Sequence, residues 1–90
     1  MTKIPDSDTE ALHAENPEAL LADNFEEAFI GYGGQYAKHP LAIYDITKCI
    51  EVLVKGGMSE DAAEEFLSFN VLGAWMGEGT PIFMTPRSDD

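Results

Sequence analysis

Apolar residues repeat with the period of a helix in the middle of the chain. The repeating positions, spaced i, i+3, i+4 and i+7, are Ile46, Cys49, Ile50 and Leu53. Because this spacing gathers apolar side chains on one side of a helix, it predicts an amphipathic helix whose stripe lies in the core. Asp45 is expected to cap the start of this helix, and Gly56-Gly57 to end it in a left-handed turn.

A second helical pattern follows this turn. Ser59 is the expected N-cap, and Glu60 and Asp61 occupy the first turn, where the helix dipole favours negative charge. The expected buried face consists of Ala63, Phe66, Leu67, Asn70 and Ala74. We expect this helix to run past Gly73, to stop near Gly77 and to complete an αα-hairpin with the first helix.

Shorter apolar segments predict strands. Side chains alternate between two faces in residues 28–32 and 41–44, and residues 81–84 begin with a proline, which a strand tolerates at its first position. A glycine-containing loop separates the first two segments, so they are expected to form a hairpin. We therefore predict an α+β fold, in which a small antiparallel sheet of about three short strands packs against the αα-hairpin.

The start of the chain differs from the rest because it contains few large apolar side chains and several acids. We expect residues 1–15 to be a mobile acidic segment, residues 16–86 to be a single α+β domain, and residues 87–90 to be a C-terminal tail. Asn16-Pro17-Glu18 is typical of a helix start, with Asn16 as N-cap and Pro17 at the first helical position.

The stretch from residue 69 to residue 83 contains four candidates for a structural role: Asn70, Gly73, Trp75 and Gly77. Asn70 is expected to be at least half-buried and to bridge backbone groups near the turn after Gly77, a ligand-binding amide being the alternative. Gly73 is expected where the helix closely approaches the sheet. Trp75 is expected to cover the core, with a recognition residue as the alternative. We interpret this stretch as the end of a helix and the start of a strand.

The chain is strongly acidic. Seventeen Asp and Glu residues outnumber five Lys and Arg residues, which gives a formal net charge of −12. This charge repels nucleic acid and anionic membranes, and it favours a protein partner with a basic surface. No apolar run approaches the ~20 residues of a transmembrane helix, and residues 1–18 lack the apolar core of a signal peptide. We therefore expect a soluble cytoplasmic protein that binds neither nucleic acid nor membranes directly.

Candidate catalytic and metal-ligating residues are few and scattered. His13 lies in the segment expected to be mobile, His39 in the hairpin loop, and Cys49 on the buried stripe, where a thiol is usually a small apolar filler. No spacing of His, Cys and Asp fits a zinc site, and neither GYGGQY nor GEGTP has the context of a phosphate-binding loop. We therefore predict a non-catalytic protein with no metal and no cofactor.

Four acidic residues of the second helix are candidate partner-binding residues: Glu60, Asp61, Glu64 and Glu65. The helix dipole accounts for the first two, because they lie in the first turn. Glu64 and Glu65 lie beyond it and repel the first pair at i, i+4, by ~0.2–0.5 kcal/mol per pair. Two interpretations stay open, a plain solvated face and a negative strip that docks on a basic partner.

Four segments together form a longer pattern: Tyr44-Asp45, KCIEVL, GMSEDAAEEF and FNVLGAWMGEGTPIF. In this order and spacing, over roughly residues 25–84, the chain resembles a family of small uncharacterised proteins from bacteria and their phages. The resemblance implies a phage or prophage context and a compact α+β domain. Gly56-Gly57 departs from the pattern, because a longer and acidic turn is expected there.

Two classes of function agree with these features. The first is a phage or prophage accessory protein that acts by protein binding, as an acidic inhibitor of a host nucleic-acid-handling or defence protein such as a CRISPR effector. The alternative is a small interaction or homo-oligomerisation module, such as a homodimer, that does not mimic nucleic acid. A steep loss of partner binding with salt would distinguish the first class from the second.

Overall fold

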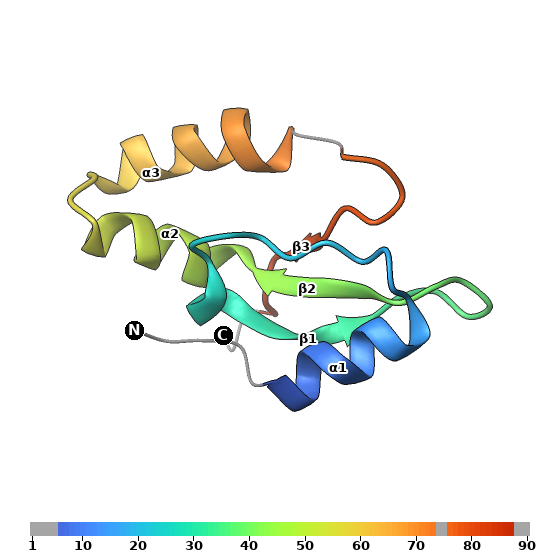
Figure 1. Cartoon of the computed structure of the whole chain (residues 1–90). Helices are drawn as coiled ribbons and strands as arrows, with labels where there is room; N and C mark the ends of the chain where they lie inside the picture. The colour runs from blue at the N-terminus through green and yellow to red at the C-terminus, as the bar shows by residue number, and fades with distance from the viewer. Residues whose placement is uncertain (1–5, 74–75, 88–90) are drawn as a thin grey trace.

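The computed structural model describes residues 6–73 and 76–87, which form an α+β domain (Figure 1). The helices are α1 (Asp6–Glu15), α2 (Ile46–Lys55) and α3 (Glu60–Leu67), and the shorter helical turns are η1 (Glu26–Ala28) and η2 (Ser68–Leu72). The strands are β1 (Phe29–Gly33), β2 (Leu41–Asp45) and β3 (Ile82–Met84). The predicted fold class is confirmed, and so is the αα-hairpin.

β2 is the central strand of the sheet, which has the order β1-β2-β3. β1 and β2 are antiparallel, whereas β2 and β3 are parallel. The prediction of an antiparallel sheet is therefore wrong for the second pair of strands. The physical reason is the connection, because α2, α3 and η2 carry the chain back to the end of the sheet at which β2 begins. β3 consequently runs in the same direction as β2.

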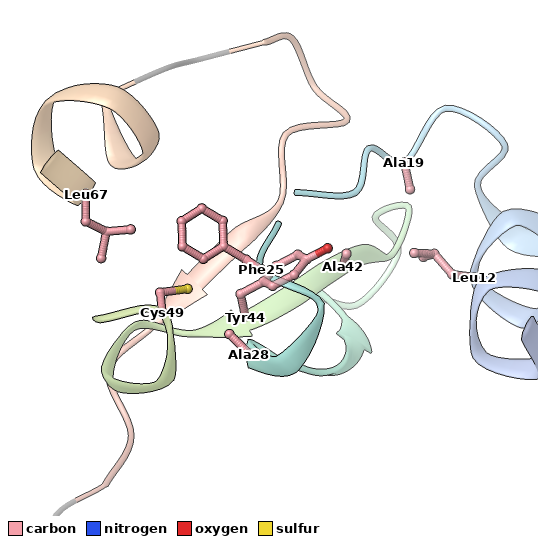
Figure 2. Packing of buried hydrophobic residues seen from close by; sticks show 8 residues of the cluster. All are labelled: Leu12, Ala19, Phe25, Ala28, Ala42, Tyr44, Cys49 and Leu67. Carbon is pink, nitrogen blue, oxygen red and sulfur yellow. The ribbon is translucent and has the colours of Figure 1, made fainter. Parts of the chain in front are cut away.

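One face of the sheet forms the core. The ring of Tyr44 is fully buried there, with Phe29 in edge contact (centroids 5.7 Å apart) and Phe83 stacked on it (5.6 Å). The Tyr44 hydroxyl accepts a hydrogen bond from the Ala22 amide (2.8 Å), which satisfies the buried oxygen. Figure 2 shows the buried cluster around this ring, which consists of Leu12, Ala19, Phe25, Ala28, Ala42, Tyr44, Cys49 and Leu67. The core thus joins α1, the sheet, α2 and α3.

The αα-hairpin has the predicted caps. The Asp45 carboxylate and the Ser59 hydroxyl each accept a hydrogen bond from the backbone amide three residues later, both at 3.2 Å. Cys49, on the predicted stripe, is fully buried. Gly57 has a φ of +112°, which is the left-handed turn that the Gly56-Gly57 pair predicts. Local sequence therefore determines where both helices begin and where α2 ends.

The N-terminal segment is part of the fold. Residues 6–15 form α1, and Figure 2 shows its fully buried Leu12 beside Ala42. His13 Nε2 forms a hydrogen bond with the Ala19 carbonyl oxygen (2.9 Å). Residues 6–15, which were expected to be mobile, form a helix in the structure, and burial of its leucine contributes ~1.5–3 kcal/mol to the docking of this otherwise polar helix. Residues 1–5 lie outside the described residues.

Asn16 follows a helix and does not start one. Its amide donates to the Leu12 carbonyl oxygen (2.8 Å), and its side chain is buried. The side-chain Nδ2 donates to the Pro40 carbonyl oxygen (2.9 Å), and Oδ1 accepts from the Glu18 amide (3.2 Å). The predicted N-cap is therefore wrong, because the Asn16 amide group instead ties the end of α1 to the β1–β2 hairpin.

The turn before β3 packs against the same N-terminal region. The Leu20 amide donates to the Gly79 carbonyl oxygen (2.9 Å). A Cβ added at Gly79 would collide with the Glu18 carbonyl group, so this position requires glycine. Gly77 has a φ of +97°, and its carbonyl oxygen accepts from both the amide and the hydroxyl of Thr80 (3.1 and 2.6 Å). Gly77 therefore lies in a turn, and not at the end of the helix, where it was expected, because η2 ends at Leu72.

Candidate protein-binding site

α3 and η2 bury only a narrow face. Ala63 and Leu67 are buried and Val71 is half-buried, at intervals of four residues. The predicted stripe also included Phe66 and Asn70, and both of these side chains are exposed. The prediction is therefore wrong for these two residues, and more of the helix surface is open to solvent than the sequence suggested.

The exposure of Asn70 has a local cause. η2 is a π-helical turn, in which more residues complete one revolution than in an α-helix. The wider turn directs Asn70 away from the core and keeps Val71 toward it. Asn70 Nδ2 donates to the Phe66 carbonyl oxygen one turn earlier in the same helix (3.2 Å). Asn70 thus supports its own helix and does not bridge to the turn at Gly77.

Two further candidates come from the end of this helix. Gly73 follows the last helical residue of η2, so the expected continuation of the helix past Gly73 is wrong. A Cβ added at Gly73 would meet the carbonyl oxygens of Ser68 and Phe69 (3.3 and 3.8 Å), which belong to the preceding helical turn and not to the sheet. The predicted close approach to the sheet is therefore wrong at Gly73. Trp75 lies outside the described residues.

Two phenylalanines lie on the solvent side of this helix. Phe66 is 37% exposed and Phe69 is 77% exposed. Asp61, Glu65 and Phe69 follow one another at intervals of four residues, so they form one row along the helix. Exposed aromatic side chains next to each other on one element are typical of protein interaction sites. We define the outer face of α3 by six residues: Glu60, Asp61, Glu64, Glu65, Phe66 and Phe69.

The four carboxylates of this face are all exposed, as the sequence predicts. Among the described residues none of the four forms an ion pair. Lys55 is close in sequence, but its Nζ pairs with Glu27 Oε2 (3.6 Å) and not with a carboxylate of α3. The N-terminal half of the outer face is therefore uncompensated negative charge, and the C-terminal half is aromatic. This arrangement can attract a basic surface and then bury apolar area against it.

Cys49, the single cysteine of the chain, lies in the core. Burial, and to a smaller extent the nearby Asp45 carboxylate, raises the pKa of the Cys49 thiol to about 11, so the sulfur is protonated at neutral pH and is enclosed in the core. Residues 6–73 and 76–87 contain no group of three or more His, Cys, Asp or Glu side chains placed to hold a metal ion. No helix in this part of the chain is long and apolar enough to cross a membrane.

Comparison with known proteins found no matching family model, no similar curated protein and no similar solved structure. The resemblance to bacterial and phage proteins thus has no support from a family match. The assignment of the candidate site is therefore based on the geometry and charge of its residues alone.

Sequence reasoning found the four carboxylates but missed the phenylalanines. Phe69 precedes Asn70 and lies outside the expected apolar stripe, which is the signal that could have identified it as an exposed aromatic residue. Phe66 gave no such signal, because its spacing from Ala63 and Leu67 is that of a core position in an ordinary α-helix.

Proposed function

We propose that this chain is a non-catalytic protein-binding domain that docks the outer face of α3 on a basic protein surface. One observation carries the proposal, namely that the exposed Asp61 and Glu65, which form no ion pair among the described residues, stand in one row with the exposed Phe69 along α3 and η2. The proposal extends to a bacterial cytoplasmic setting and to a partner of the nucleic-acid-handling or defence kind.

The charge of the domain supports a basic partner. With a formal net charge of −12, the chain repels other polyanions and is steered toward positive surfaces. Proteins that bind nucleic acid carry such surfaces, because Lys and Arg side chains neutralise phosphates. A domain docked there would compete with the nucleic acid and so inhibit the partner.

The two halves of the face have different roles in this proposal. Rim carboxylates chiefly raise the association rate and its dependence on salt. Phe66 and Phe69 supply binding energy, because fully burying a phenylalanine contributes ~1.5–3 kcal/mol. In this proposal the carboxylates favour association with a basic partner, and the phenylalanines stabilise the complex once it has formed.

Capture of partners from a bacterial host lysate tests the proposal. The wild type is compared with Glu64→Gln, Glu65→Gln and with a matched control, Glu10→Gln, Glu15→Gln, which removes two exposed charges from α1. We expect the α3 variant to lose a partner that the control retains, and we expect added salt and a competing oligonucleotide to displace that partner. The stability of the α3 variant should hold or rise by ~0.2–0.5 kcal/mol, since like charges are removed.

A second variant, Phe69→Ala, separates the two halves. It should weaken binding of the same partner by accelerating dissociation, with little change in the salt dependence. Equal capture by wild type and both α3 variants at low and moderate salt would show that the outer face is only a solvated surface.

A further inference from the structure

The β1–β2 hairpin loop and the turn before β3 leave the same end of the sheet (Figure 1). β1 and β2 are antiparallel and β2 and β3 are parallel, so β1 ends where β2 and β3 begin. A groove of about 1160 Å³ lies at this end, between the loop of residues 34–40 and the turn of residues 76–81. Its lining includes Leu41 and Ile82, the first residues of β2 and β3.

Hydrogen bonds fix the sides of this groove relative to each other. The Leu20 amide donates to the Gly79 carbonyl oxygen (2.9 Å), which ties residues 16–20 to the turn. Asn16 Nδ2 donates to the Pro40 carbonyl oxygen (2.9 Å), which ties the same residues to the hairpin loop. The groove is therefore preformed, as binding sites usually are.

The groove carries charges of both signs. Glu18 and Glu78 line it from the two segments that the bond between Leu20 and Gly79 joins, whereas Lys38 lines it from the hairpin loop. All three charged side chains are exposed. Among the described residues no ion pair joins Lys38 to either glutamate. The charges of the groove therefore do not neutralise one another by direct contact, and a ligand can pair with them.

From these features we infer that the groove binds an extended peptide segment of a partner protein, with one Lys or Arg side chain and, a few residues away, one acidic side chain. The basic side chain lies against Glu18 and Glu78, and the acidic side chain lies against Lys38. The apolar residues of the lining are Leu20, Leu41, Met76 and Ile82. An apolar side chain of the segment, between its two charges, packs on these residues.

Charge and size favour this occupant over others. A polybasic segment would place like charge against Lys38, and a nucleic acid would place phosphates against Glu18 and Glu78. The volume exceeds the roughly 300–1,000 Å³ of most small-ligand sites, so several residues of a peptide have room. The inference goes beyond the proposed function, because none of the six residues of the outer face of α3 lines the groove.

A random heptapeptide library displayed on phage provides the probe. We expect selection on the wild-type protein to enrich peptides that contain one basic, one acidic and one large apolar residue. The most enriched peptide is then synthesised with a fluorescent label, and its dissociation constant is measured by fluorescence anisotropy. Failure to enrich any sequence, or enrichment of peptides without a basic residue, would overturn the inference.

Glu18→Gln, Glu78→Gln tests the contact with the basic side chain. Both glutamates are exposed, so the variant should keep the melting temperature of the wild type. We expect it to raise the dissociation constant of the peptide about tenfold or more, because charge-assisted hydrogen bonds are lost. The matched control is Glu10→Gln, Glu51→Gln, which removes two exposed charges outside the groove and should leave the dissociation constant unchanged.

A peptide in which glutamine replaces the basic residue completes a double-mutant cycle with the groove variant. The replacement should weaken binding to the wild type about tenfold but hardly affect binding to Glu18→Gln, Glu78→Gln, because the groups that pair with the basic residue are already absent. Lys38→Gln should weaken only those peptides that keep the acidic residue. Additive losses in the cycle, or a control that weakens binding as much as the groove variant does, would show that the peptide does not occupy the groove in this way.

Discussion

Asn16 and Asn70 show how two similar residues acquire opposite environments. Asn16 is buried and joins the end of α1 to the β1–β2 hairpin through the Pro40 carbonyl group. Asn70 is exposed and bonds only one turn back along its own helix, to Phe66. The sequence favoured the reverse assignment, in which Asn70 was the buried bridge. Burial of a polar side chain thus depends on which distant segment covers it.

The same contrast extends to the regions around the two asparagines. The region of residues 12–20 is tied to the hairpin and to the turn before β3 by backbone and side-chain hydrogen bonds. The α3–η2 region packs through Ala63 and Leu67 and leaves two phenylalanines exposed. The first region stabilises the fold, and the second leaves exposed the side chains to which we assign the proposed binding role.

The largest expected difference concerns one apolar side chain from each region. Leu12→Ala should reduce the free energy of unfolding by ~2–5 kcal/mol, because it removes a fully buried leucine and leaves a cavity under α1. Phe69→Ala should change it by less than ~0.5 kcal/mol, because Phe69 is exposed. Chemical denaturation of both variants measures the difference. If Leu12→Ala were as stable as the wild type, α1 would not be part of the core.

The next difference concerns the two glycines. Gly79→Ala should cost ~1–3 kcal/mol, because the added methyl group collides with the Glu18 carbonyl group and forces the turn apart. Gly73→Ala should be tolerated to within ~1 kcal/mol, since its φ is −85° and its methyl group meets one carbonyl oxygen at 3.3 Å. The melting temperatures of the two variants rank them. If Gly73→Ala were the less stable of the two variants, the end of η2, and not the turn at Gly79, would determine how the chain enters β3.

The smallest difference concerns the asparagines themselves. Asn16→Ala should cost ~1–3 kcal/mol, because it leaves the buried Pro40 carbonyl oxygen without its partner. Asn70→Ala should cost less than ~1 kcal/mol, because solvent can replace its exposed hydrogen bond to Phe66. Hydrogen exchange at the Glu18 amide, which bonds Asn16 Oδ1, should accelerate only in the first variant. Equal losses from both substitutions would contradict the contrast between the regions.

Local sequence patterns identified the elements that local forces stabilise. Asp45 and Ser59 cap the helices that they were expected to cap, and Gly57 ends α2 in the left-handed region. β1 and β2 lie within one residue of the predicted segments, since alternation and a short loop are enough to specify a hairpin. The exposure of Glu60, Asp61, Glu64 and Glu65 also followed from the pattern, although their proposed binding role remains a prediction.

The candidate site was less predictable than the fold. Its carboxylates were found from their excess on one helix, but Phe66 was assigned to the core. A π-helical turn changes which residues share a face, and the spacing of apolar residues assumes a regular α-helix. The turn accounts for the exposure of Asn70, whereas Phe66 lies before it in α3 and is exposed because only Ala63 and Leu67 of that helix are buried.

By itself, the sequence determined the αα-hairpin, the strands, the caps of α2 and α3 and the acidic character of the chain, because each depends on composition or on residues a few positions apart. Only the tertiary structure decided that α1 docks, that β2 and β3 are parallel and that Asn16 rather than Asn70 is buried. Each of these depends on interactions between segments far apart in the chain, such as the hydrogen bond from Asn16 to Pro40 and the burial of Leu12 in the cluster around Tyr44. Such interactions depend on the direction in which the chain returns to the sheet and on which part of the core surface is available to a leucine or an amide side chain. The local periodicity of apolar residues carries no information on either.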